Sequence, residues 1–465
     1  MIEGLRPYPE TRPTGLPWLP ELPAAWEIHR AKYSFREADE RSAQGDEELL
    51  SVSHKTGVTP RSQKNITMFM AESYEGHKVC RPGDIVVNTM WAWMAALGVS
   101  HHVGIVSPAY GVYRPRTTIQ FEPRYLDYLL RTEAYSAEYL RSSRGVTTSR
   151  LRLYPLDFLK IPFVQPPLDE QRLIVRFLDW HGVQTAKLIR AKKKLIALLN
   201  EQKQAIIHRA VTRGLDTNVK LKTTGVPWLG EMPAHWEVRK LKHLTRFHNG
   251  LAFKPSDWSG AGIPIIRIQN LNGSEAFNYT TKEDLPGFLL INKGDLVFSW
   301  SGNRGTSFGP FVWNRDYSGY LNQHIFKLTH ISANLTYFYF VLRAVTKHVE
   351  EETHGIIGLV HITKPELGSV CVPLAPPREQ AAIANWIEEQ VSGLDAIIGR
   401  AQREISLLQE FRTRLTADVV TGKLDVRAVA ANLPEIVEPQ LIDEPIEGEE
   451  LDETIDETED EEVAA

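Results

Sequence analysis

The sequence predicts an α+β protein: two tandem mixed α/β domains separated by a long antiparallel two-helix coiled coil, with a disordered acidic C-terminal tail. Three observations lead to this fold class. A segment near the amino terminus recurs 210 positions later, and each copy is followed by a Pro-Pro pair that opens a long heptad pattern. In addition, a chain of 465 residues is too long for one ordinary hydrophobic core.

The repeated segment, here called the Trp-Pro segment, begins each copy. It reads TGLPWLPELPAAWEI at 14–28 and TGVPWLGEMPAHWEV at 224–238. A second match joins PPLDEQ at 166–171 to PPREQ at 376–380, and an offset of 209 then continues to the end of the repeat. Solenoid units are only roughly 20 to 50 residues long, so this repeat indicates duplication of a whole domain.

The duplication divides the chain into five segments. We expect a first domain at 1–165, its helix at 166–215, a second domain at 216–375, its helix at 376–427 and a tail at 428–465. Inside the domains, IPIIRIQNL and GDLVFSW are typical of strands, whereas RYLDYLLRTEAYSAEYLRSS predicts an amphipathic helix. The domain interiors share little more than RPGDIVV against NKGDLVF, as a module used twice for different targets would.

Both helices carry apolar residues at alternating steps of three and four, which is a coiled-coil pattern. We call these positions the seam. The seam residues are Leu178, Ile189, Ile196, Leu199 and Ile206 in the first helix, and Ile387, Val391, Leu394, Ile398, Ile405, Leu408 and Leu415 in the second. Two equal patterns at equal positions favour helices that pack against each other, and the intervening domain favours an antiparallel pair. Packing of each helix on its own domain is the alternative.

The net charge of −5 conceals a basic excess. The tail, 428–465, holds 15 Asp or Glu and no Lys or Arg, so the first 427 residues carry 53 basic against 43 acidic side chains. Such an excess is compatible with a polyanionic partner. The tail itself buries too little apolar surface to offset its chain entropy, and we expect it to be disordered.

Several sequence features are absent, and their absence limits the cellular compartment and the chemistry that we expect. Two cysteines, Cys80 and Cys371, argue against a disulfide framework, and no apolar run is long enough for a membrane span, so we expect a cytoplasmic protein without a membrane partner. There is no G-x-x-x-x-G-K-[ST] loop, no Asn-Pro-Pro-Tyr-type motif and no Cys or His pair with zinc-ligand spacing. We therefore expect a non-catalytic chain that binds no metal and no cofactor.

The motifs together resemble one family. Gly-Xaa-Pro-Trp, then Pro-Xaa-Xaa-Trp-Glu, a variable domain and PP(X)EQ opening a coiled-coil helix are similar to the specificity subunit of type I restriction–modification enzymes, twice over, across nearly all of 14–427. Pro20 against Gly230, the missing Lys-rich sequence after the first copy and the acidic tail depart from the pattern.

This resemblance implies both a function and partners. It implies two target recognition domains, each reading one half of a bipartite, asymmetric site in double-stranded DNA. It also implies that the helices set the spacing of the half-sites and dock two methylation subunits, through which restriction subunits join. Adenine methyltransferase and ATP-dependent endonuclease activities, with S-adenosylmethionine, ATP and Mg, would belong to those partner subunits.

Polar and basic side chains in the domains are candidates for base and phosphate contacts, because base edges are read by such groups. In the first domain the candidates are Lys55, Thr59, Arg61, Lys64, Arg141, Arg144, Thr147, Thr148 and Arg150. In the second they are Arg267, Gln269, Asn270, Ser301, Asn303, Arg304 and His361. Each could equally lie in a solvated turn.

Two other functions remain as alternatives. A coiled-coil scaffold with two ligand-binding lobes would explain the seam but not the Trp-Pro segments. An unrecognised nuclease or methyltransferase would explain neither the repeat nor the missing catalytic motifs.

Overall fold

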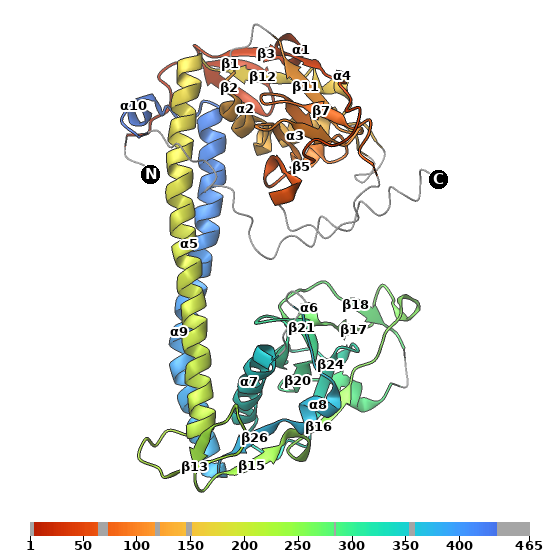
Figure 1. Ribbon diagram of the computed structural model, residues 1–465, viewed down its shortest axis with the longest axis vertical. Coiled ribbons are helices and arrows are strands. Elements are labelled where there is room, and N and C mark those ends of the chain that lie inside the picture. Colours follow the sequence, from red (N-terminus) through yellow and green to blue (C-terminus); the bar gives the residue numbers. More distant parts are fainter. Residues whose placement is uncertain are drawn as a thin grey trace. The chain divides into compact units, whose positions relative to one another are not determined.

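The computed structural model describes residues 4–63, 73–116, 121–145, 151–282, 285–352 and 359–434 (Figure 1). The chain forms two compact units. Unit 1 comprises Met1–Lys192 with Arg403–Ala465, and unit 2 comprises Lys193–Gln402. Each long helix therefore contributes one part to each unit. The division expected from the sequence, into consecutive segments, did not anticipate this.

Unit 1 is an α+β unit built on a four-stranded antiparallel sheet of order β4-β11-β8-β9. Its strands are β1 (Thr11–Leu16), β2 (Leu19–Pro23), β3 (Glu27–Arg30), β4 (Phe35–Glu37), β5 (Leu50–Ser53), β6 (Gly57–Pro60), β7 (Lys78–Cys80), β8 (Ile85–Val87), β9 (Leu97–Val99), β10 (Gly104–Val106), β11 (Gly111–Pro115) and β12 (Pro162–Gln165). Its helices are α1 (Ala31–Ser34), α2 (Pro123–Leu130), α3 (Glu133–Ser142), α4 (Pro155–Phe158), the start of α5 (Leu168–Arg213), the end of α9 (Pro377–Val420) and α10 (Arg427–Ala430).

Unit 2 repeats this plan around a sheet of order β16-β24-β20-β22 and adds a second sheet, β18-β17-β23-β19. Its strands are β13 (Leu221–Thr223), β14 (Glu231–Pro233), β15 (Glu237–Lys240), β16 (Arg246–Asn249), β17 (Ile263–Ile266), β18 (Asn278–Thr280), β19 (Leu290–Ile291), β20 (Leu296–Ser299), β21 (Ser301–Asn303), β22 (Gly309–Val312), β23 (Gly319–Leu321), β24 (Ile325–Thr329), β25 (Leu359–His361) and β26 (Cys371–Leu374). Its own helices are α6 (Ile268–Leu271), α7 (Leu335–Glu352) and α8 (Lys364–Ser369).

The sheets β4-β11-β8-β9 and β16-β24-β20-β22 correspond strand by strand, and in each an acidic residue before the third strand of the order pairs with a basic residue of the second. In unit 1 Asp84 precedes β8 and accepts a hydrogen bond from Arg114 of β11 at 2.9 Å. In unit 2 Asp295 precedes β20 and pairs with Lys327 of β24 at 2.7 Å. Asp84 is almost fully buried, so its charge needs this partner. The short sequence match RPGDIVV against NKGDLVF therefore marks equivalent positions in the two folds.

The Trp-Pro segments form the junction between domain and helix in each unit. Each makes a hairpin, β1–β2 or β13–β14, and then a strand that pairs with the strand before the long helix, β3 with β12 and β15 with β26. Trp26 and Trp236 are each only 1% exposed. Trp26 packs on Gly422 at the end of α9, and Trp236 on Gly214 at the end of α5. The segment is thus needed twice, because each copy receives the end of the other copy's helix.

The prediction of a long helix after each Pro-Pro pair is confirmed. Proline suits the first turn of a helix, where its missing N–H is not needed. In unit 1 Lys192 of α5 forms an ion pair with Glu404 of α9, while the start of α5 packs with the end of α9. In unit 2 Lys203 pairs with Asp395 at 2.5 Å. Inside each unit the two helices therefore run antiparallel; Figure 1 shows them in yellow-green and blue.

The seam is apolar and shielded along both helices. Its residues are all buried or half-buried, the most buried being Leu178, Ile387, Val391, Ile398 and Leu415. Near the end of α5 the buried residue is one position later than predicted. Ile206 is half-buried, whereas its neighbour Ile207 is 1% exposed and packs into the core of unit 2. The globular domain, rather than the partner helix, decides which face is buried there.

The expectation of a disordered tail from residue 428 is wrong at the start of that range. Residues 427–430 form α10, and Ala430 is fully buried in the core of unit 1 with Val426. Asp425 accepts a hydrogen bond from the backbone N–H of Arg427, which helps to begin this turn. The 15 acidic residues all follow residue 434 and lie outside the described residues. Within the part of the chain that is described, no helix is long and apolar enough to cross a membrane.

Candidate nucleic-acid interface

In unit 2, three of the predicted residues meet on one small ladder. β21 pairs with β25, which places Ser301 opposite His361 and Asn303 opposite Leu359. His361 and Asn303 are exposed and Ser301 is half-buried. Arg304 is also exposed and begins the turn after β21, where the Gly305 N–H donates to Glu350 at 2.7 Å. The ladder presents donors and acceptors of several kinds to solvent from a fixed backbone.

The other predicted group of unit 2 lies on α6 and is partly structural. The Asn270 amide accepts from the Arg267 N–H at 2.9 Å and donates to two backbone carbonyls, and the residue is only 3% exposed. These bonds explain the residue as a brace for the turn. Arg267 is half-buried with its guanidinium 4.8 Å from the centre of the Trp258 ring, and Gln269 remains exposed.

Sequence reasoning missed a polar group beside that ladder. Trp300 follows β20, and its ring lies 4.9 Å from the His324 ring and 4.8 Å from the His361 ring, centre to centre. Gln323 is exposed, and its Nε2 lies 2.9 Å from Nε2 of His324. Burial lowers the pKa of His324, and nearby His361 lowers it further, so this ring is neutral near pH 7. The signal in the sequence was LNQHIF, in which three polar residues stand between apolar ones.

In unit 1 the predicted arginines lie around the end of α3. Arg141 pairs with Glu138 at 2.6 Å, and Arg144 pairs with Asp157 at 2.8 Å, yet both side chains are more than two thirds exposed. Ion pairing raises the pKa of Arg141 and so maintains its charge. The Arg144 and Arg152 backbones exchange hydrogen bonds at 2.9 Å. Thr147, Thr148 and Arg150 lie outside the described residues.

The remaining candidates of unit 1 belong to the β5–β6 hairpin. Lys55 is exposed at its turn, Thr59 is half-buried in β6, and Arg61 is half-buried at the start of the helical turn that follows. The Arg131 guanidinium donates to the Lys55 carbonyl and thereby ties the hairpin turn to α2. Lys64 lies outside the described residues.

Hydrogen bonds show that both units carry a polar surface at the same place in the fold. In unit 2 the Ile362 N–H donates to the Trp300 carbonyl at 3.0 Å, and the Trp300 N–H donates to the His324 carbonyl at 3.1 Å. In unit 1 the Leu153 N–H donates to the Thr89 carbonyl at 2.9 Å, and the Thr89 hydroxyl donates to the Ala109 carbonyl at 3.0 Å. Hence Thr89, Ala109 and Arg152 correspond to Trp300, His324 and His361.

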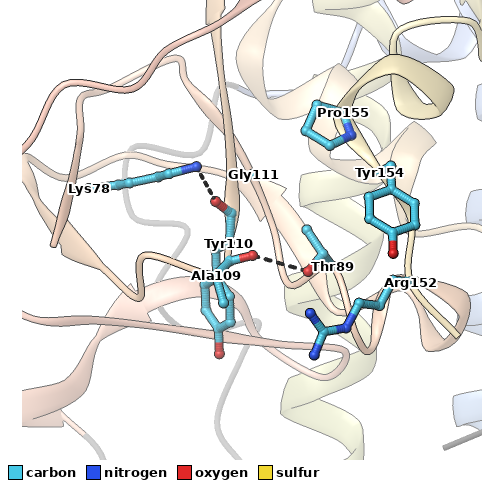
Figure 2. A pocket seen from close by; sticks show the side chains of 8 residues that line it. All are labelled: Lys78, Thr89, Ala109, Tyr110, Gly111, Arg152, Tyr154 and Pro155. Carbon is cyan, nitrogen blue, oxygen red and sulfur yellow. Dashed lines mark hydrogen bonds between the residues drawn. The ribbon is translucent and has the colours of Figure 1, made fainter. Parts of the chain in front are cut away.

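In unit 1 this place is hollowed into a cavity of about 130 Å³. Its lining consists of Lys78, Thr89, Ala109, Tyr110, Gly111, Arg152, Tyr154 and Pro155. Figure 2 shows the Arg152 guanidinium extending toward Tyr110, with the exposed Tyr154 ring beside it. Lys78 Nζ donates to the Tyr110 carbonyl at 2.9 Å. The exposed Arg152 guanidinium and the two aromatic rings make this surface suited to nucleic acid, since phosphates attract cations and bases stack on rings. Lys78 is buried and pairs with Asp39 at 3.6 Å.

Comparison with known proteins agrees with the resemblance to type I specificity subunits. Residues 233–406 match the family described as "Type I restriction modification DNA specificity domain". The MjaVIII specificity subunit of Methanocaldococcus jannaschii is 24% identical over 320 residues, which are 64% of this chain and 70% of that protein. The EcoKI specificity subunit of Escherichia coli K12 is 25% identical over 389 residues, 77% of this chain and 78% of that protein. The resemblance to type I specificity subunits is confirmed.

The fold agrees with the same family. A chain from a solved structure on complex assembly and conformational transition of the type I R-M system has a TM-score of 0.58 at 17% identity, covering 86% of this chain and 98% of that chain. The match to a DNA specificity domain and the similarity to curated specificity subunits support a function in DNA recognition.

Proposed function

We propose that this specificity subunit reads a bipartite, asymmetric site in double-stranded DNA, with the globular part of each unit reading one half-site. The observation that carries the proposal is the shared polar surface, because one scaffold presents Thr89 and Arg152 in unit 1 but Trp300 and His361 in unit 2. Equal backbones with unequal polar side chains are what two readers of different sequences require.

The residues that contact bases or phosphates are proposed from these surfaces. In unit 2 they are Ser301, Asn303, Arg304 and His361 of the ladder, with Arg267 and Gln269 as further contacts. In unit 1 they are Arg141, Arg144 and Arg152, together with Lys55 and Arg61. The Thr59 hydroxyl is buried and does not reach the surface. The exposed guanidiniums suit phosphates or guanine, while amides and hydroxyls suit base edges.

We further propose that α5 and α9 form one antiparallel coiled coil that sets the distance between the half-sites. The helices have 46 and 44 residues, which at about 1.5 Å per residue is roughly 65 Å each. Support comes from the ion pairs Lys192–Glu404 and Lys203–Asp395, because both fit the same antiparallel register. The shielded seam supports it as well.

Two matched apolar pairs on the helices are proposed docking sites for two methylation subunits. In unit 1 Leu188 and Leu407 are 46% and 62% exposed, and in unit 2 Leu198 and Ile397 are 53% and 45% exposed. Each residue lies one position before a seam residue. In antiparallel helices such positions share one side of the pair.

The four residues are also related by the repeat. Leu188 corresponds to Ile397 and Leu198 to Leu407, so each unit combines one member from each copy. Exposed apolar side chains that gather on one side of a surface can mark an interaction site. Two equivalent pairs therefore predict two equivalent subunits, which would carry the adenine methyltransferase activity with S-adenosylmethionine. Restriction subunits, with ATP and Mg, would join through them.

Mass measurement of the assembled complex tests the docking sites. Leu188→Asp with Leu407→Asp should remove one methylation subunit, and Leu198→Asp with Ile397→Asp should remove the other. An equal pair of changes at exposed polar positions of the same helices, Glu201→Asp with Glu410→Asp, is the control. Retention of two methylation subunits by both Leu/Ile variants would contradict the assignment.

DNA selection tests the reading function itself. The chain assembled with methylation subunits should enrich, from random duplexes, two fixed half-sites separated by a fixed number of unspecified base pairs. Enrichment of a single contiguous site, or of no site, would refute the two-reader proposal.

A further inference from the structure

Gln323 lies at a junction where the backbone is held from several directions. It sits in the three-residue link between β23 and β24, which belong to different sheets. The preceding Asn322 N–H donates to Ile266 of β17 at 3.0 Å, and the Trp300 indole donates to the Gln323 carbonyl at 3.0 Å. A side chain presented from such a fixed turn loses little freedom on binding, which favours precise recognition.

Gly250 adds a further restraint on the same turn. Its N–H donates to the Ile325 carbonyl at 2.9 Å. A Cβ at position 250 would lie 1.9 Å from the Asn322 carbonyl oxygen, so only glycine allows this approach. The link 322–324 is therefore fastened to β17, to Trp300 and to the segment after β16.

The Gln323 carboxamide is oriented by its neighbour. Gln323 Nε2 lies 2.9 Å from Nε2 of His324. An amide nitrogen only donates, so this contact requires the tautomer in which the ring Nε2 accepts and the buried Nδ1 carries the proton. A carboxamide has two N–H donors and one carbonyl oxygen. With one donor engaged, Gln323 retains one N–H and Oε1 on the exposed side of the turn.

The remaining N–H donor and Oε1 acceptor of Gln323 are complementary to one base. In the major groove adenine presents an N7 acceptor beside an N6 donor, and glutamine pairs with both. Guanine presents two acceptors, N7 and O6, so Oε1 would face an acceptor there. The engaged N–H prevents the amide from supplying two donors and thereby disfavours guanine.

We infer that Gln323 reads an adenine in the half-site of the second domain, and that His324 is the positioning residue that fixes its amide. This inference rests on the proposed function, in which the surface around β21 and β25 faces DNA. It adds a specificity-determining residue outside the set that the sequence suggested.

The test is a scan of the unit 2 half-site with 7-deazaadenine, which lacks the N7 acceptor but pairs normally. The complex of full-length chain and methylation subunits is titrated with duplexes that carry one substitution each. Wild type should lose affinity at one adenine by roughly 5- to 150-fold, the equivalent of about 1–3 kcal/mol at 1.4 kcal/mol per tenfold. Gln323→Ala should bind the natural duplex that much more weakly and be insensitive to 7-deazaadenine at that adenine.

Two further variants separate reading from folding. Gln390→Ala makes the same chemical change at an exposed position of α9 and should leave the whole scan unchanged. His324→Phe retains a ring against Trp300 but removes the acceptor, so the ratio of natural to 7-deaza affinity should fall at that adenine only. His324→Gln, whose oxygen and nitrogen can again meet the amide, should restore part of the ratio.

The outcomes distinguish this inference from the function on which it rests. A complex that selects no DNA sequence would refute the proposed function. A selective complex in which no adenine of that half-site is sensitive, or in which Gln323→Ala retains the wild-type sensitivity, would overturn the inference alone. The wild-type scan decides even if Gln323→Ala fails to assemble.

Discussion

Substitution of Gly422, where α9 ends, tests whether the end of the second copy's helix packs on the Trp-Pro segment of the first copy. Its φ of +76° is a left-handed conformation, and an added Cβ would lie 2.4 Å from Pro23 Cδ and 3.1 Å from the Trp26 ring. Gly422→Ala thus meets two costs. A left-handed alanine costs about 1–2 kcal/mol, and forcing a methyl into a packed contact costs about 1–3 kcal/mol more.

Gly15 separates these two costs because it shares the first but not the second. Its φ is +74°, and nothing lies within 4 Å of an added Cβ. Gly15→Ala should therefore cost only about 1–2 kcal/mol, whereas Gly422→Ala should cost about 2–5 kcal/mol. Gly214→Ala, with φ of +71° and a contact of 3.1 Å to Trp236, should fall between them in unit 2.

The assay is urea unfolding of the purified chain, combined with hydrogen exchange of peptides from 11–30. Gly422→Ala should lower the midpoint more than Gly15→Ala does and should increase exchange in the Trp-Pro segment. Equal effects of Gly15→Ala and Gly422→Ala would mean that the end of α9 does not pack on Pro23 and Trp26, and the reasoning would be refuted.

Three further predictions concern charge, spacing and base contact. The pKa of Asp425 is lowered chiefly by its hydrogen bond with Arg427, so its contribution is present above the unfolded pKa of about 3.9 and is lost as pH falls through the lower folded value. Asp425→Asn should therefore destabilise unit 1 at pH 7, with a difference from wild type that disappears in acid unfolding below that range. Inserting four residues after 196 and four after 400 should lengthen the coiled coil by about 6 Å and change the number of base pairs between half-sites, seen in DNA selection, without changing either half-site. Arg304→Ala should weaken binding to one half-site by about 1–3 kcal/mol if Arg304 contacts a base, whereas equal weakening for all DNA sequences in a titration would show a phosphate contact.

The periodic features of the fold were predictable because their signals are local. The helices expected at 166–215 and 376–427 are found at Leu168–Arg213 and Pro377–Val420, since heptad spacing and Pro-Pro starts are properties of short windows. The duplication was visible for the same reason. Shielding of the seam followed from its spacing, except near the end of α5, where contact with the core of unit 2 buries Ile207 instead of Ile206.

Long-range packing could not be read from the sequence. Trp26 packs on Gly422, and Trp236 packs on Gly214, so each helix ends on the Trp-Pro segment of the other copy. Nothing in a local window specifies this exchange. It is also why the units combine separate stretches of chain, and why the residues directly after 427 are folded.

The candidate site shows the same limit for single side chains. Asn270 and Gln323 carry the same amide group, but Asn270 is 3% exposed and braces a turn, whereas Gln323 is exposed at the junction of two sheets. The sequence gives residue type, whereas availability depends on burial and on hydrogen-bond partners. Ser301 and His361 were both candidates from the sequence, but their adjacency depends on the pairing of β21 with β25.

The most direct test of two separate readers is an exchange of one reader. Residues 26–165 are replaced by the equivalent stretch of a related specificity subunit, the chimera is assembled with methylation subunits in cells, and methylated adenines are mapped across the genome. The account predicts that one half of the methylated site changes while the other half and the spacing remain as in the parent. A chimera whose two half-sites change together would contradict it.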